Sequence, residues 1–357
     1  MCIRDSPLSL HHPSTRRDSL NRRSRIFLKL ESLQPSGSFK SRGVGNLCLQ
    51  SLIRSQHPDR VHFFSSSGGN AGLACVHAAN SLGRPCTVVV PRSTKPMMIA
   101  KIRAAGASEV VQEGESWREA DAHLQSVVLP KAESRGEEGV YVPPFDHPDV
   151  WAGNQTIIHE LEQQLGYEGP PDILVCSVGG GGLFCGLAQG IEELGWTKTQ
   201  ILAMETDGCN ALNHSLHQGA NSLLPGGITS RATSLGAVKV ADRAYELAAK
   251  SGQVKSVVLS DAEAAMGCWR FADDERGLVE MACGVNLALC YGGRLEKALG
   301  RAVRPEERVV VVVCGGSVVT TEMVEGWRRE FGDLDGGEKG SNGNGDVPSA
   351  TTAPNGA

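Results

Sequence analysis

Short apolar runs with the character of strands alternate with longer amphipathic runs with the character of helices from Ile26 onward. This alternation predicts an α/β fold in which parallel sheets are covered by helices. The expected strands are residues 26–30, 61–64, 87–90, 109–112, 173–178, 200–205 and 309–313. The expected helices are residues 41–57, 71–82, 96–105, 117–129, 150–165, 183–194, 261–274 and 280–299. Ser260 and Glu263 form a capping-box pattern at the start of the helix 261–274.

Both ends of the 357-residue chain lack this alternation. Residues 1–25 hold arginines among Ser, His and Pro without an apolar period, which favours a disordered or misread terminus. A mitochondrial presequence, which would be rich in Arg and Ser, is the alternative, and a cloning artefact is a third interpretation of residues 1–6. Residues 332–357 contain no large apolar residue beyond Leu334, which predicts a disordered tail.

Charge and cysteine content exclude several classes of protein. The net charge of −5 gives no general affinity for nucleic acid or anionic membranes, and apolar runs such as 309–314 are too short to span a bilayer. The 11 cysteines include no Cys-x-x-Cys pair and show no zinc or disulfide spacing. We therefore expect buried free thiols and a reducing compartment, with a cytoplasmic location and a mitochondrial one as the alternative.

Four consecutive glycines, Gly179 to Gly182, lie between an expected strand and an expected helix. Glycines let main-chain N–H groups surround an anion, and a helix N-terminus adds partial positive charge, so this turn predicts a phosphate site. A dinucleotide fingerprint fails because Phe184 and Cys185 occupy the third-glycine positions. No Lys-Ser/Thr pair follows, which excludes a nucleotide P-loop.

Three further segments follow expected strands and carry reactive or polar groups. Lys40 offers an amine, the side chain that condenses reversibly with an aldehyde cofactor. Ser67 and the N–H groups after it suit a substrate carboxylate, although a solvated turn capped by Asn70 is the simpler interpretation of that segment alone. Cys314 ends a five-valine strand, where a thiol is more often core filler than ligand.

Taken together, these segments resemble the serine/threonine dehydratases, fold type II pyridoxal-phosphate enzymes related to tryptophan synthase β. The similarity is greatest to the fungal L-serine dehydratase/L-threonine deaminase group and covers about residues 26–331. The segments that carry it are Ser36-Gly37-Ser38-Phe39-Lys40-Ser41-Arg42-Gly43, Ser66-Ser67-Gly68-Gly69-Asn70-Ala71-Gly72, Ser177-Val178-Gly179-Gly180-Gly181-Gly182-Leu183 and Val313-Cys314-Gly315-Gly316-Ser317. Pro144-Phe145-Asp146-His147-Pro148, Met204-Glu205-Thr206-Asp207-Gly208 and Val279-Glu280-Met281-Ala282-Cys283-Gly284 also match.

The resemblance implies a large cofactor-binding domain (26–40 and 141–331) and a small substrate domain (41–140). It implies pyridoxal 5′-phosphate as cofactor, with Lys40 as Schiff-base lysine and proton shuttle. The cofactor would also contact Phe39, Asn70, Gly179, Gly180, Gly181, Gly182, Leu183, Ser234 and Cys314. The substrate carboxylate would meet Ser67, Gly68, Gly69, Asn70 and Ala71, with Ser67 among the catalytic groups. A potassium site would involve Glu205, Cys209, Ala211, Leu235 and Ala237.

The implied reaction is β-elimination of L-serine to pyruvate and ammonia, and of L-threonine to 2-oxobutanoate and ammonia. It would serve amino-acid catabolism and gluconeogenesis in a homodimer that binds neither nucleic acid nor membrane. A thiol at Cys314 would not hold the ring nitrogen strongly protonated, which favours prompt loss of the β-hydroxyl over transamination. A serine racemase or another β-eliminase of this fold, and a cofactor-binding protein without useful turnover, are the alternatives.

Several positions depart from the family pattern. Asn154, Met281 and Val318 stand where His, Pro and Asn are usual, and no helix is expected before residue 26. None of these departures removes a proposed catalytic group. The altered N-terminus motivates the alternative of a protein that binds cofactor without turnover, because damage to folding or to a dimer contact would follow from it.

Overall fold

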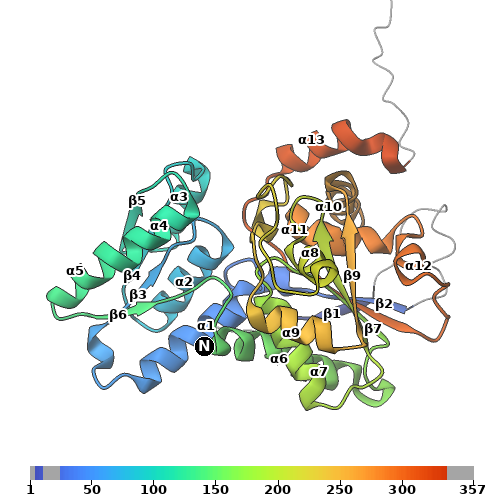
Figure 1. Cartoon of the computed structure of the whole chain (residues 1–357), viewed down its shortest axis with the longest axis horizontal. Helices are drawn as coiled ribbons and strands as arrows, with labels where there is room; N and C mark the ends of the chain where they lie inside the picture. Colours follow the sequence, from blue (N-terminus) through green and yellow to red (C-terminus); the bar gives the residue numbers. More distant parts are fainter. Residues whose placement is uncertain (1–4, 11–24, 336–357) are drawn as a thin grey trace, which may run out of the picture.

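Two sheets, one in each lobe, organise the molecule (Figure 1). The computed structural model describes residues 5–10 and 25–335. The sheet of the large lobe has the strand order β1 (Leu8–Leu10), β2 (Arg25–Lys29), β10 (Arg308–Val312), β7 (Ile173–Ser177), β8 (Gln200–Thr206) and β9 (Val254–Leu259). The sheet of the small lobe has the order β5 (Glu109–Gln112), β4 (Cys86–Val90), β3 (Val61–Ser65) and β6 (Glu138–Tyr141). Every pairing is parallel except that of β1 with β2.

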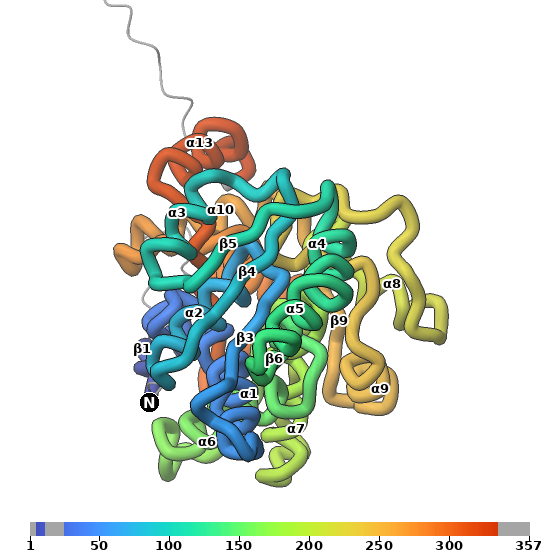
Figure 2. The backbone as a smooth tube through the Cα atoms, turned by 90° about the vertical axis from the view of Figure 1, so that its left-hand side faces the viewer, coloured from blue at the N-terminus to red at the C-terminus, as the bar shows by residue number. Residues whose placement is uncertain are grey.

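Helices cover both faces of the small sheet, which confirms the α/β prediction (Figure 2). α1 (Lys40–Arg54) and α2 (Asn70–Ser81) pack on one face, while α4 (Trp117–His123) and α5 (Leu129–Ser134) pack on the other. α1 also packs against α6 (Pro148–Leu165), so this helix joins the two lobes. The remaining helices are α3 (Pro96–Ala104), α7 (Gly182–Glu193), α8 (Ala211–Gln218), α9 (Asp242–Lys250), α10 (Asp261–Glu275), α11 (Met281–Leu287), α12 (Arg294–Leu299) and α13 (Thr321–Phe331).

Each strand and helix expected from the sequence has a counterpart, with three corrections to helix bounds. The helix expected over 41–57 ends at Arg54, because Ser55 is extended. The helix expected over 280–299 is two helices, α11 and α12. A 3-10 turn, Ala288–Cys290, follows α11, and Gly292 and Gly293 then adopt positive φ, which breaks the helical path before α12. The helix expected over 117–129 continues through a π-helical segment to Ser134. The capping box at α10 is confirmed, since Ser260 Oγ accepts from Glu263 N at 3.2 Å and Glu263 Oε2 accepts from Ser260 N at 3.0 Å.

Six elements were not predicted, namely β1, β6, β9, α8, α9 and α13. β1 and β6 are too short to show a period, and pairing with a neighbouring strand stabilises each of them. β1 lies in the segment 1–25 that we expected to be irregular, so the structure corrects that expectation for residues 8–10. The presequence hypothesis rests largely on residues 1–4 and 11–24, and most of the expected tail is residues 336–357; these lie outside the described residues.

Ten cysteines of the described residues are free and buried, as expected from their spacing. In residues 5–10 and 25–335, no helix is both long enough and apolar enough to cross a membrane.

Candidate active site

Loops from both lobes meet after the carboxyl ends of strands β2, β3 and β10. Phe39 N donates to Cys314 O at 3.1 Å, and Gly316 N donates to Gly37 O at 2.9 Å. Ser317 N donates to Asn70 Oδ1 at 2.9 Å across the two lobes. The structure therefore gathers the segments of Lys40, Asn70 and Cys314, which are far apart in the sequence.

Lys40 is the first residue of α1, and its side chain points toward the segment between β6 and α6. Its Nζ donates to Pro144 O at 2.5 Å and lies 5.2 Å from the centroid of the Phe39 ring. Burial of the amine lowers the pKa of Lys40 to about 8, and the nearby Cys314 sulfur opposes that change. Lys40 thus has a substantial neutral fraction near physiological pH, as a nucleophile or base requires.

This pKa predicts how the protein without cofactor reacts with an aldehyde cofactor. Only the neutral amine attacks a carbonyl, so the attachment rate rises with pH below about 8 and levels off above it. Stopped-flow absorbance across a pH series measures this rate. A midpoint near 10.5, the ordinary value for lysine, would contradict a buried amine.

The glycine turn forms a main-chain cradle at the N-terminus of α7. Gly181 has a φ of +94°, and a Cβ on Gly180 would lie 2.3 Å from Cγ of Phe145. A Cβ on Gly182 would lie 2.6 Å from Phe145 O, so this side of the turn is closed by packing. Within the described residues, the N–H groups of residues 179–183 have no hydrogen-bond acceptor. Unpaired N–H groups at a helix N-terminus fit the phosphate of the implied cofactor.

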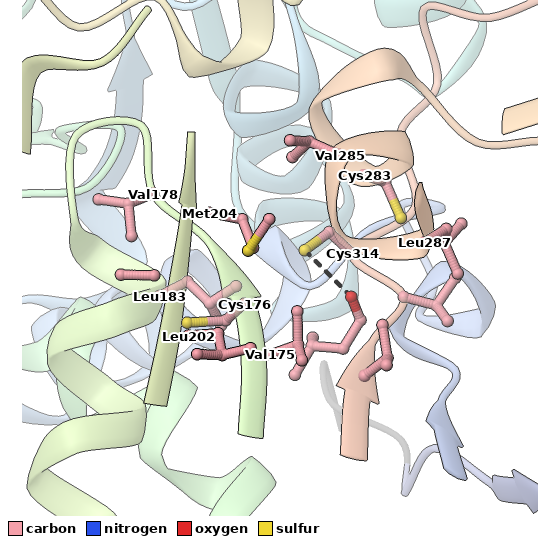
Figure 3. Packing of buried hydrophobic residues seen from close by; sticks show 14 of the residues in the cluster. Val175, Cys176, Val178, Leu183, Leu202, Met204, Cys283, Val285, Leu287 and Cys314 are labelled. Carbon is pink, nitrogen blue, oxygen red and sulfur yellow. Dashed lines mark hydrogen bonds between the residues drawn. The ribbon is translucent and has the colours of Figure 1, made fainter. Parts of the chain in front are cut away.

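Cys314 lies in the buried layer beneath this site, beside Cys283 and Met204 (Figure 3). Its thiol points to Val312 O at 3.6 Å, and its sulfur lies 3.3 Å from Ser177 Oγ. A hydrogen bond with the Cys283 thiol is the main cause that lowers the pKa of Cys314, and Ser177 adds to it against the effect of burial. Polar partners therefore hold Cys314 in a fixed orientation.

Glu280 is a site residue to which the sequence analysis gave no role. Its Oε1 accepts from Asn70 Nδ2 at 3.0 Å and from Val318 N at 2.8 Å, and its Oε2 accepts from Ser234 Oγ. Glu280 thus fixes two predicted cofactor contacts, one from each lobe. The sequence signal that could have identified Glu280 is an acidic residue within the otherwise small or apolar segment 279–284.

The loop after β3 carries the predicted substrate contacts at the N-terminus of α2. Ser67 Oγ accepts from Gly69 N at 3.3 Å, and Ser67 and Gly68 are half-buried. The neighbouring Ser66 Oγ donates to Asp121 at 2.5 Å, and Tyr141 OH donates to the same carboxylate oxygen at 2.7 Å. The loop is therefore anchored from behind, and its hydroxyl and main-chain N–H groups form a surface suited to a carboxylate.

Two of the departures from the family pattern lie beside the site. Asn154 Nδ2 donates to Gly182 O at 2.9 Å, so this residue supports the glycine turn. Val318 contributes its main-chain N–H to Glu280, a contact that does not depend on its side chain. Neither departure removes a group from the site.

The residues of the predicted potassium site lie near the end of β8, at the start of α8 and in the segment before α9. The carboxylate of Glu205 is fully buried and accepts from Leu212 N and Asn213 N, each at 2.8 Å. Burial raises the pKa of Glu205 to about 8, and these two N–H groups oppose the effect. Leu235 O accepts from Ala237 N at 2.7 Å. Among the described residues, no group of three or more His, Cys, Asp or Glu could hold a metal ion.

Comparison with known proteins adds independent findings. A family model described as pyridoxal-phosphate dependent enzyme matches residues 3–315. An L-serine dehydratase of Saccharomyces cerevisiae is 43% identical over 305 residues, which cover 83% of this chain and 89% of that protein. A catabolic L-serine/threonine dehydratase of Saccharomyces cerevisiae is 42% identical over 310 residues, 85% of either chain. A fungal L-serine ammonia-lyase from Rhizomucor miehei superposes with a TM-score of 0.81 and 33% identity, covering 92% of this chain and 99% of that one.

Proposed function

The chain belongs to the family of pyridoxal-phosphate dependent enzymes, and on that premise we propose that it is an L-serine and L-threonine ammonia-lyase. It converts L-serine to pyruvate and ammonia, and L-threonine to 2-oxobutanoate and ammonia. One observation carries the proposal. The amine of Lys40 donates to Pro144 O. The next residue, Phe145, packs against Gly180 and Gly182 of the glycine turn. Residues 144–145 therefore connect the nucleophile with the expected phosphate site.

The side chains of this site have separate tasks in the proposed reaction. The cofactor, when bound, supplies the electron sink that stabilises negative charge at Cα. Lys40 Nζ would bind the cofactor aldehyde, and as a neutral amine it would accept the proton from Cα of the substrate. The N–H groups of residues 179–183 would hold the phosphate, and Cys314 would be the partner of the ring nitrogen. Ser67 and the N–H groups of residues 68–71 orient the substrate carboxylate.

Turnover of the cofactor-loaded protein with L-serine and with L-threonine tests this proposal. We expect formation of a 2-oxo acid from both substrates, with D-serine absent from the L-serine reaction. D-serine as the main product would make the protein a racemase. A bound-cofactor absorbance band without any 2-oxo acid would make it a binding protein without turnover.

We further propose a potassium ion at Glu205, with carbonyl oxygens of Cys209, Ala211, Leu235 and Ala237 as partners. The support is the buried carboxylate of Glu205, which accepts hydrogen bonds from two main-chain N–H groups. Burying a charged carboxylate costs free energy, and a nearby cation would offset that cost.

Potassium is therefore expected to stabilise the fold more at pH 9 than at pH 7, since binding requires the ionised form of Glu205 and its pKa is about 8. Thermal unfolding in potassium chloride, against equal ionic strength of tetramethylammonium chloride, measures the effect. Equal melting temperatures in the two salts at both pH values would remove the proposed site.

We also propose a homodimer that works in amino-acid catabolism and gluconeogenesis in the cytoplasm. Ten buried free thiols support a reducing compartment. Sedimentation equilibrium should give about twice the chain mass of 37.8 kDa.

A further inference from the structure

Four charged side chains are buried together at the first turn of α1, namely Lys29, Glu31, Arg42 and Glu160. Arg42 binds both carboxylates in a bidentate manner. Its Nε and Nη2 donate to Glu31 at 2.6 and 2.8 Å, and its Nη1 and Nη2 donate to Glu160 at 2.5 and 2.8 Å. Lys29 Nζ donates to Glu160 Oε2 at 2.5 Å. The two positive and two negative charges balance, so the cluster can persist out of water.

Ser6, from the N-terminal segment, fills the centre of this four-charge cluster. Its N–H donates to Glu160 Oε2 at 3.1 Å, and its hydroxyl donates to Glu31 Oε1 at 2.6 Å. Its carbonyl accepts from Lys29 Nζ and from Gln164 Nε2, each at 2.8 Å. The N–H, hydroxyl and carbonyl groups of Ser6 therefore each form a hydrogen bond with a residue of the cluster. Without it, Lys29 and Gln164 would each lose a buried acceptor.

Arg42, which belongs to this cluster, lies two residues after Lys40 on α1. The first turn of α1 has no side-chain cap, while Val44, Leu47 and Cys48 of the same helix belong to the core of the small lobe. Arg42 ties this turn to the large lobe through Glu31 and through Glu160 on α6. The neighbouring Ser41 adds a neutral contact, since its Oγ accepts from Ser36 N at 3.0 Å. The helices also touch closely here, since a Cβ on Gly153 of α6 would lie 2.4 Å from Arg42 O.

We propose that Arg42 is a positioning residue that fixes the Lys40 amine at Pro144 O, and that Ser6 completes the anchor of Arg42. The inference rests on the proposed function, in which Lys40 holds the cofactor. Burial opposes the charge on Glu160, but Arg42 and Lys29 outweigh it and lower the pKa of Glu160, so both carboxylate oxygens remain acceptors at neutral pH. The reaction rate depends strongly on the position of the reacting groups, because a displacement of about 1 Å lowers the rate by about 100-fold.

Arg42→Lys in the full chain tests the proposal, with the cofactor-loaded protein used for turnover and the cofactor-free protein used for the attachment rate. Lysine keeps the positive charge but cannot form bidentate hydrogen bonds with two carboxylates at once. We expect kcat to fall about 10- to 100-fold with little change in KM. We also expect the cofactor to attach to Lys40 more slowly by a similar factor. Borohydride trapping followed by peptide mass mapping measures that attachment.

The matched control is Arg54→Lys, on the same helix. Arg54 also makes a bidentate pair with α6, to Asp149 at 2.6 and 2.9 Å, but it is exposed and lies at the far end of α1. We expect this control to keep wild-type kcat and attachment rate. A folded Arg42→Lys protein with unchanged kcat and attachment rate, even if it melts earlier, would overturn the proposal.

Ser6→Ala keeps the proposal testable if Arg42→Lys fails to fold. It removes one hydroxyl and should lower both rates a few-fold, in the same direction. Wild-type rates in a folded Ser6→Ala protein would remove Ser6 from the anchor. Failure of the proposed function is distinguishable, because wild-type protein would then show no cofactor on Lys40 or no 2-oxo acid.

Discussion

Lys40→Ala will reduce 2-oxo acid formation from L-serine by about 10²- to 10⁴-fold or more, because the chain loses both its attachment point for the cofactor and its base. The cofactor should still bind, since the glycine turn and Cys314 remain. The bound form should show the spectrum of a free aldehyde, and borohydride should label no lysine. Added alkylamines should restore part of the activity, because a small base can enter the space that the side chain leaves.

The control for this variant is Lys101→Ala, which removes another lysine amine that is bonded to a loop of the site. Lys101 Nζ donates to Ser317 O at 2.5 Å from α3 of the small lobe. We expect this variant to keep the borohydride label on Lys40 and most of the activity. If borohydride labelled another lysine instead of Lys40 in the wild-type protein, Lys40 would not be the residue that binds the cofactor.

Gly180→Ala is the second change for which we expect a large effect. The new methyl group would lie 2.3 Å from Cγ of Phe145, a distance at which the turn or the ring must move. Because the N–H groups of this turn must converge on one phosphate, we expect the Kd for cofactor to rise at least about tenfold, about 1.4 kcal/mol. Overpacking should also lower the free energy of unfolding by about 1–3 kcal/mol.

Gly326→Ala is the matched control, because nothing lies within 4 Å of the Cβ that it would add on α13. Alanine in a helix interior should stabilise the protein by about 0.5–1 kcal/mol and leave cofactor affinity unchanged. Fluorescence titration with cofactor and denaturant unfolding measure the two quantities. Wild-type affinity in Gly180→Ala would mean that the turn does not bind the phosphate.

The alternation of strands and helices and the polar loops could be read from the sequence because both are local. A glycine run after a strand, or a lysine between a strand and a helix, needs only its neighbours to be recognised. The role of Glu280 could not be read in this way, because its partner Asn70 is 210 positions away. Ser6 is the extreme case, since its contact with Glu160 spans 154 positions and the segment around it has no period.

The position of β10 has a consequence for how the chain folds during synthesis. This strand, at residues Arg308–Val312, lies between β2 and β7, and it pairs with β2 across nearly the whole chain. The four strands of the small sheet, in contrast, all lie within residues 61–141. Domains fold as units while the ribosome advances, so the small lobe can fold early, whereas β2 waits for the last strand to emerge. A chain terminated before residue 308 would leave the large sheet split in two, with β2 and β7 each missing a neighbour.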